Sequence, residues 1–195
     1  ELDDASIEAF HRELMERNNL DNGVIYVQVT RGVAERDFAY PPDTTPTVIA
    51  FTQPRDYGGD RNATDGVRVV TTPDLRWARR DIKSIALLPQ AMGKQIAKQR
   101  GAFEAWMVED GLVTEGTSSS AFILTADGVI VTRALGREIL PGLTRSRLLA
   151  LIEDEKLPVD QRPFSVEEAL AAREAFLTSA SSFVLPVISI DGHPV

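Results

Sequence analysis

The chain has 195 residues, of which 43% are hydrophobic and 26% are charged, a composition typical of one large globular domain or two small ones. Acidic residues outnumber basic ones, 29 to 21, and the net charge of -8 argues against a nucleic acid or an anionic membrane surface as the main partner. The absence of cysteine excludes disulfides, thiolate metal sites and cysteine nucleophiles, and it fits a reducing, cytoplasmic compartment. Two histidines near opposite ends make a Ser-His-Asp triad or a histidine-rich metal site a poor candidate.

The first part of the chain carries one helical and two strand-like patterns. Apolar residues recur at helical spacing in residues 4–20, which predicts an amphipathic surface helix. β-Branched and aromatic residues fill 24–30 and 47–51, which predicts two strands of one sheet. No stretch approaches the roughly 18 consecutive apolar residues of a membrane span, and no leader pattern opens the chain, so we expect a soluble, unexported protein.

A change of composition predicts a domain boundary. From residue 53 to residue 66 the chain is rich in Pro, Gly, Asp, Asn and Arg, which is typical of a linker or a long exposed loop. We therefore predict two α/β domains: residues 1–53 as the remainder of a small N-terminal domain, 54–66 as the linker, and 67–195 as the larger domain.

The larger part contains several more strand-like segments. The dipeptides Asp110-Gly111 and Asp127-Gly128, which favour tight hairpins, separate some of them. The predicted strands lie at 67–71, 103–108, 121–124, 129–132, 175–178 and 184–190.

Three helices are predicted between these strands. One starts near Pro89, where a first-turn proline is tolerated, another covers 144–155, and a capping box of Ser165 and Glu168 begins a third. The first two are expected to bury apolar faces made of Ile85, Leu88, Met92 and Ile96, and of Leu148, Leu149, Leu151 and Ile152.

Some polar residues could carry chemistry, although each also has a plain structural explanation. Lys83 is either a solvated surface charge or a Schiff-base lysine whose pKa is lowered by burial and nearby cations. Glu115 precedes small hydroxyl residues, in either a polar loop or a site that aims a carboxylate at a cationic ring nitrogen. Thr144 begins a helix, where it is either an N-cap or part of a phosphate site. The hydroxyls near Ser179 form a second such site or a simple turn.

The order of these segments resembles the fold-type IV pyridoxal-phosphate enzymes, the class IV aminotransferase family, and most closely the D-amino acid transaminases. The resemblance covers nearly the whole chain and implies a two-domain α/β fold with α+β character and a homodimer whose subunits share each site. It rests on Asp81-Ile82-Lys83-Ser84, Thr114-Glu115-Gly116, Pro141-Gly142-Leu143-Thr144-Arg145, Phe176-Leu177-Thr178-Ser179 and Pro186-Val187-Ile188-Ser189-Ile190-Asp191-Gly192.

The resemblance implies a role for each matching residue. Lys83 would carry pyridoxal 5'-phosphate as an internal aldimine and move the α-proton, and Glu115 would keep the cofactor's ring nitrogen protonated. Leu140 would pack on the ring, and Ser118 would lie near the ring and the lysine. The phosphate would be held by Leu143, Thr144, Ser179 and Ala180.

Three positions depart from the family pattern. Ala180 stands where a threonine is usual, so one hydroxyl toward the phosphate is lost, and Ser120 replaces a usual asparagine. Arg36 matches the arginine that binds the substrate carboxylate through a two-pronged hydrogen bond, but Phe38 stands where a histidine is expected.

The implied activity is transfer of the amino group of a D-amino acid, such as D-alanine, to a 2-oxo acid, such as 2-oxoglutarate. The alternatives are a branched-chain L-amino acid aminotransferase, an aminodeoxychorismate lyase and a non-catalytic protein that binds the cofactor. A basic cluster at Arg76, Trp77, Arg79 and Arg80 would suit a phosphate or a nucleic acid, but the acidic net charge opposes this.

Overall fold

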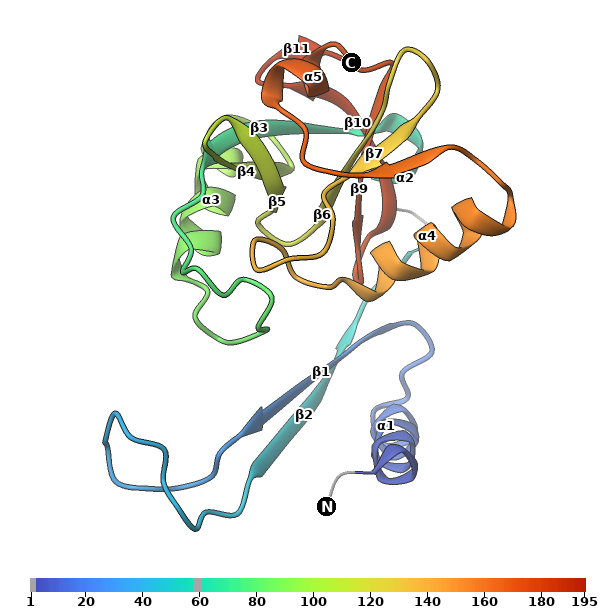
Figure 1. Ribbon diagram of the computed structural model, residues 1–195. Helices are drawn as coiled ribbons and strands as arrows, with labels where there is room; N and C mark the ends of the chain where they lie inside the picture. Colours follow the sequence, from blue (N-terminus) through green and yellow to red (C-terminus); the bar gives the residue numbers. More distant parts are fainter. Residues whose placement is uncertain (1–2, 58–60) are drawn as a thin grey trace. The chain divides into compact units, whose positions relative to one another are not determined.

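The protein is described by a computed structural model that covers residues 3–57 and 61–195 (Figure 1). The chain divides into two units, residues 1–60 and residues 61–195. This division falls inside the segment 54–66 that we predicted as a linker. The segment is more structured than predicted, because strand β2 extends to Pro54 and a short helix, α2 (Asn62–Asp65), occupies part of it.

Unit 1 consists of one helix and one hairpin. Helix α1 (Asp4–Asn18) begins after Asp3, whose carboxylate accepts a hydrogen bond from the Ser6 N–H at 2.8 Å, and ends at Asn19 in the left-handed conformation. Strands β1 (Gly23–Thr30) and β2 (Thr47–Pro54) pair antiparallel along their whole length. The predicted helix and both predicted strands are therefore confirmed.

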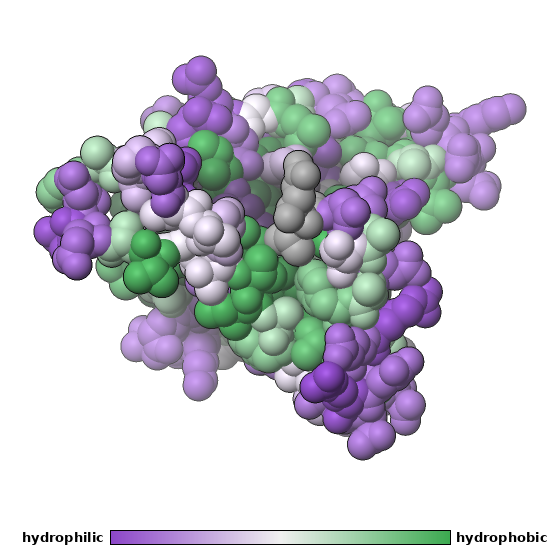
Figure 2. All heavy atoms as spheres, turned by 90° about the horizontal axis from the view of Figure 1, so that it is seen from below, coloured by the Kyte–Doolittle hydropathy of each residue, from purple (hydrophilic) through white to green (hydrophobic). Residues whose placement is uncertain are grey.

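Unit 1 buries little apolar surface within itself. Among residues 3–57, only Leu20 is buried, while Val29, Ile49 and Phe51 of the hairpin are exposed. Figure 2 shows hydrophobic surface between hydrophilic side chains on the face of the molecule that it draws. An isolated two-stranded hairpin is only marginally stable in water, and unit 1 consists of one hairpin and one helix.

Unit 2 is built on a mixed sheet in which the nine strands of residues 61–195 take part. The strand order is β5-β4-β3-β10-β9-β6-β7-β8, with β11 paired to β10. Pairs β3–β4, β3–β10 and β7–β8 are parallel, and the others are antiparallel, which confirms the predicted α/β class with α+β character. The strands are β3 (Val67–Pro73), β4 (Glu104–Glu109), β5 (Leu112–Gly116), β6 (Ser120–Leu124), β7 (Ile130–Thr132), β8 (Val159–Gln161), β9 (Glu174–Ser179), β10 (Phe183–Ile190) and β11 (His193–Pro194).

Tight turns and side-chain packing hold this sheet in register. Asp110 and Gly111 both have positive φ, 52° and 76°, as a two-residue hairpin turn between β4 and β5 requires. The core is formed by alternate strand residues, with Trp106 packed edge-on against Phe164 at 6.2 Å between ring centroids. No helix among residues 3–57 and 61–195 is both long and apolar enough to span a membrane.

Helix α3 (Leu88–Gln99) buries a different face from the one predicted. Gly93 and Ala97 are its buried residues, whereas Leu88 and Met92 are exposed and Ile85 lies before the helix. A Cβ on Gly93 would lie only 2.7 Å from Cγ2 of Thr117, so close approach of the helix selects small residues on this face.

The other helices agree better with the sequence. Helix α4 (Leu143–Asp154) buries Ile152 as predicted, but Leu151 is exposed, which corrects that part of the predicted face. Helix α5 (Val166–Leu170) begins at Ser165, whose hydroxyl accepts from the Glu168 N–H at 3.1 Å, as the capping box predicts.

Candidate active site

A cavity of about 700 Å³ opens in unit 2, and eight of the nine predicted site residues line it. Its walls come from the loop between β3 and α3, the turn between β5 and β6, the start of α4 and the end of β9. The eight residues are Lys83, Glu115, Ser118, Leu140, Leu143, Thr144, Ser179 and Ala180. Residues far apart in the sequence therefore meet at one cavity.

The ninth predicted residue, Arg36, belongs to unit 1. Its side chain is exposed, and its guanidinium carbon lies 5.3 Å from the centre of the Phe38 ring. Phe38 is the residue that replaces the expected histidine, so this position offers a cation–π contact instead of a second hydrogen-bond donor.

Glu115 lies on a buried strand and not in a polar loop. Strand β5 holds the Glu115 side chain at 7% exposure, where Oε1 accepts from Arg76 and both carboxylate oxygens accept from the Leu140 N–H at 3.2 Å. Burial raises the pKa of the Glu115 carboxyl, although the Arg76 charge and these hydrogen bonds oppose the rise. Among the residues that the structure describes, Oε2 accepts only from Leu140, so it can accept another donor.

Arg76 lines the cavity, although the sequence analysis did not count it among the site residues. Its side chain is 5% exposed and pairs with Asp74 and Glu115, and that of Arg80 is 5% exposed and pairs with Glu109 at 2.6 Å. These two arginines therefore cannot form an exposed basic surface for a nucleic acid. The sequence contains one hint of this arrangement. Asp74 and Arg76 are two residues apart, and oppositely charged side chains at this spacing can pair within a short loop.

Glu104 is a second residue that the sequence analysis missed. It starts strand β4, its side chain is 1% exposed, and its carboxylate accepts from the hydroxyls of Thr117, Ser118 and Ser119. Its carboxylate also accepts hydrogen bonds from the backbone N–H groups of Ala105 and Ser118, and Nζ of Lys94 lies 3.5 Å from Oε1 of Glu104. Glu104 therefore fixes the hydroxyl-rich turn that lines the cavity.

Lys83 is exposed at the cavity and makes no hydrogen bond or ion pair with any residue in the described parts of the chain. The loop that carries it is anchored on its upstream side. Upstream, the Asp74 N–H donates to the Val108 carbonyl at 2.8 Å, and the Arg80 N–H donates to the Arg137 carbonyl at 2.9 Å. The loop thus presents an unpaired lysine side chain at the cavity.

The start of α4 can hold an anion. Gly142 precedes the helix without a side-chain cap, so the first N–H groups of this twelve-residue helix have no intrahelical acceptor. Six buried side-chain polar atoms in residues 3–57 and 61–195 have no hydrogen-bond partner, and four belong to cavity residues: Arg80, Gln90, Arg145 and Thr178. An anionic ligand that also carries hydrogen-bonding groups fits the N–H groups at the start of α4 and this mixture of donors and acceptors.

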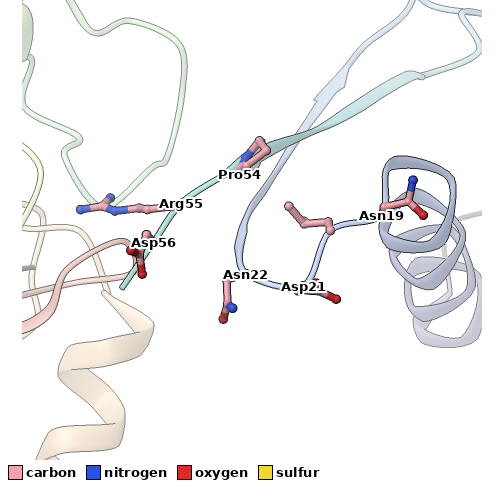
Figure 3. A pocket seen from close by; sticks show the side chains of 7 residues that line it. Asn19, Asp21, Asn22, Pro54, Arg55 and Asp56 are labelled. Atoms are coloured by element: carbon pink, nitrogen blue, oxygen red, sulfur yellow. The ribbon is translucent and has the colours of Figure 1, made fainter. Parts of the chain in front are cut away.

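A second pocket, of about 400 Å³, lies in unit 1 (Figure 3). It is formed by the turn after α1 and the end of β2, and Asn19, Asp21, Asn22, Arg55 and Asp56 are among its lining residues. It is open to solvent and contains none of the predicted site residues.

The larger cavity brings together an unpaired lysine, a buried carboxylate and the uncapped start of a helix on a mixed sheet. Residues 1–190 match the family model described as amino-transferase class IV, and the chain belongs to that family. The fold-type IV family inferred from the sequence motifs is therefore confirmed.

Known relatives and solved structures agree with this assignment. The chain is 40% identical to D-alanine aminotransferase of Bacillus licheniformis over 192 residues, which is 98% of this chain and 67% of that protein. A branched-chain amino acid aminotransferase of Escherichia coli superposes on 100% of this chain and 67% of its own, with a TM-score of 0.87 and 23% identity. A 4-amino-4-deoxychorismate lyase of Pseudomonas aeruginosa superposes on 96% of this chain and 71% of its own, with a TM-score of 0.80 and 27% identity. The chain spans 65–67% of the length of the curated D-alanine aminotransferases that it matches.

Proposed function

We propose that the protein transfers the amino group of a D-amino acid, such as D-alanine, to a 2-oxo acid, such as 2-oxoglutarate, with pyridoxal 5'-phosphate as cofactor. The convergence of Lys83, Glu115 and the phosphate-binding elements on one cavity is the observation that carries the proposal. The 40% identity to a D-alanine aminotransferase supports the choice of D-amino acids.

The residues of the cavity suit each part of this cofactor. The N–H groups of Leu143 and Thr144 and the polar groups of Ser179 and Ala180 would hold the phosphate, and Leu140 would pack against the ring. Oε2 of Glu115 would accept a hydrogen bond from the protonated ring nitrogen. When bound, pyridoxal phosphate supplies an electrophilic carbonyl and an electron sink.

Lys83 would have two roles in this site. Its Nζ would bond covalently to the cofactor, and in the free amine form it would take the α-proton of the substrate and return it. These roles are supported because the Lys83 side chain has no competing partner among the described residues and because the loop is anchored upstream of it. Ser118 would serve as a hydroxyl near the ring and the lysine.

Arg36 would bind the substrate's α-carboxylate. A guanidinium can donate two parallel hydrogen bonds to a carboxylate, and Arg36 is exposed and available for such a ligand. We also propose a cytoplasmic homodimer, which rests on the family resemblance and can be checked by light scattering of the purified protein.

A branched-chain L-amino acid aminotransferase is the second candidate, because Phe38 replaces the histidine expected in D-amino acid enzymes. A similarly folded E. coli protein has that activity in its name. An aminodeoxychorismate lyase and a non-catalytic cofactor carrier are further alternatives, the latter because Ala180 lacks the usual hydroxyl.

One experiment on the full-length protein tests the proposal. After loading with pyridoxal phosphate and reduction with borohydride, peptide mapping should find the adduct on Lys83, with Lys94 and Lys98 as internal controls. Mixing the protein with D-alanine and 2-oxoglutarate should produce pyruvate, and Lys83→Ala should not. An adduct elsewhere, or no pyruvate from a cofactor-loaded protein, would contradict the proposal.

A substrate panel then assigns the stereochemistry. D-alanine should be used far better than L-alanine, and Arg36→Ala should lower kcat/KM for D-amino acids by roughly ten- to a hundredfold, the worth of a charged hydrogen-bonding pair. A preference for L-leucine or L-valine would favour the branched-chain alternative.

A further inference from the structure

Three buried charged side chains form a chain at the wall of the cavity, which Arg76 and Glu115 line. Arg76 donates to Glu115 through Nη1, and it donates to the two oxygens of Asp74 through Nε and Nη2 at 2.9 and 2.7 Å. The Arg76 side chain is 5% exposed and that of Asp74 is fully buried, so water screens neither charge effectively. Thr114, the neighbour of Glu115 on β5, donates its hydroxyl to Asp74 at 2.6 Å.

Glu115 is poorly placed to stay ionised without help. Burial raises the pKa of its carboxyl, and Arg76 is the first opposing cause, followed by the Leu140 N–H. A neutral carboxylic acid could not hold a proton on a ring nitrogen as a carboxylate does. The charge of Arg76 is therefore the main protection of the form of Glu115 that the site needs.

We propose that Arg76 is a positioning residue that holds Glu115 ionised and oriented in the cavity, and that Asp74 fixes Arg76 while moderating the effect of its charge. The inference rests on the proposed function, because that function gives Glu115 its role toward the ring nitrogen. It assigns Arg76 and Asp74 a role although neither needs to touch the substrate or the cofactor.

The proposal predicts the direction in which the Glu115 titration moves when each neighbouring charge is removed. The positive charge of Arg76 lowers the proton affinity of Glu115, whereas the negative charge of Asp74 raises it. Removing each charge should therefore move the Glu115 titration in opposite directions. A pair that only stabilised the loop would move the titration in the same direction in both variants, or not at all.

Other charged groups near Glu115 stay constant in this comparison. Arg145 on α4 interacts electrostatically with Glu115, and it donates to the Arg133 carbonyl and to Gln161, at 2.8 and 3.0 Å, without contacting Asp74. The Leu140 N–H remains in every variant. Arg79, three residues after Arg76, pairs with Asp81 at 2.8 Å and gives a matched control for loss of one arginine from the same loop.

The test follows the titration of Glu115 directly. Full-length protein labelled with glutamate carrying ¹³C at the side-chain carboxyl is freed of cofactor and titrated by NMR, and the Glu115 signal is assigned by its loss in Glu115→Gln. Arg76→Gln should raise the midpoint by about one unit or more, as removal of an adjacent opposite charge does. Asp74→Asn should lower the midpoint, and Arg79→Gln should leave it in place.

Arg76→Lys guards against misfolding of the glutamine variant, because it keeps the charge and should shift the midpoint less. An unshifted midpoint in folded Arg76→Gln, equal shifts in the lysine and glutamine variants, or an upward shift in Asp74→Asn would overturn the inference. The proposed function is judged separately, since a borohydride adduct absent from Lys83 would refute it even where the cofactor-free titrations shift as expected.

Discussion

Glu104 and Glu115 lie on adjacent antiparallel strands of unit 2, and both side chains are buried. The two carboxylates differ in how many hydrogen bonds they accept. Glu104 accepts from three hydroxyls and two backbone N–H groups. Glu115 accepts from Arg76 and one backbone N–H, and its Oε2, which accepts only from that N–H, can accept another donor. The difference shows how two buried carboxylates of one fold can serve different purposes, one in stabilising the structure and one in binding a ligand. A saturated anion fixes its surroundings, and an unsaturated one at a cavity can bind a ligand.

The largest effect should come from removing the saturated carboxylate. Glu104→Ala leaves three hydroxyls and two N–H groups without their acceptor and removes the ion-pair partner of Lys94, so we expect a loss of about 3–5 kcal/mol in the free energy of unfolding. Urea denaturation followed by circular dichroism measures this loss. The control is Glu174→Ala, on an exposed side chain, which should change stability by less than about 0.5 kcal/mol. Equal effects of both variants would show that Glu104 has no special structural role.

Glu115→Gln should give the reverse pattern, with a large effect on amino transfer and a small one on stability. The amide keeps the shape but cannot hold a ring nitrogen protonated, and a charge-assisted hydrogen bond is worth about 1.5–3 kcal/mol, so turnover should fall at least roughly tenfold. Stopped-flow absorbance of the cofactor measures the rate. Unchanged turnover would remove Glu115 from the mechanism and make the two carboxylates equivalent.

The pH dependence of stability should distinguish the two ends of the Asp74–Arg76–Glu115 chain. Burial raises the pKa of Asp74, but hydrogen bonds from Arg76 and Thr114 outweigh it and leave the pKa below 3.8. Asp74 therefore contributes stability above pH 3.8 that is lost as the pH falls through its lowered value. The pKa of Glu115 is raised above 4.5, so its contribution is present below pH 4.5 and is lost as the pH rises through the raised value.

Unfolding free energies of wild type, Asp74→Asn and Glu115→Gln between pH 3 and pH 8 test these signs. The advantage of wild type over Asp74→Asn should grow with pH, and that over Glu115→Gln should shrink. Differences from wild type that do not vary with pH would show that neither carboxyl has a shifted titration.

The smallest expected effect is a gain of cofactor affinity in Ala180→Thr. The hydroxyl would return a hydrogen bond near the phosphate site at the end of β9, worth about 0.5–1.5 kcal/mol, which corresponds to roughly a two- to twelvefold lower dissociation constant. Fluorescence titration with pyridoxal phosphate measures it, with Ala172→Thr, a position outside the cavity lining, as control. No gain would place the phosphate away from Ala180.

Local patterns in the sequence predicted much of the fold. The period of α1, the β-branched run of β1 and the capping box of Ser165 depend on neighbouring residues, and they were confirmed. The order of the Lys83, Glu115 and Thr144 motifs identified the family for the same reason, because each motif is a short local sequence.

The sequence by itself determined the family, the fold class and which short motifs could carry chemistry. Tertiary structure alone decided the buried face of α3, since it depends on how closely Gly93 approaches Thr117. It also decided the partners of the two carboxylates. Glu104 meets the hydroxyls of the turn after β5, and Arg76 meets Glu115, only because the sheet pairs β4 with β5 and the loop after β3 folds beside them. Burial and charge pairing are properties of packed neighbours distant in sequence, so no local pattern carries them.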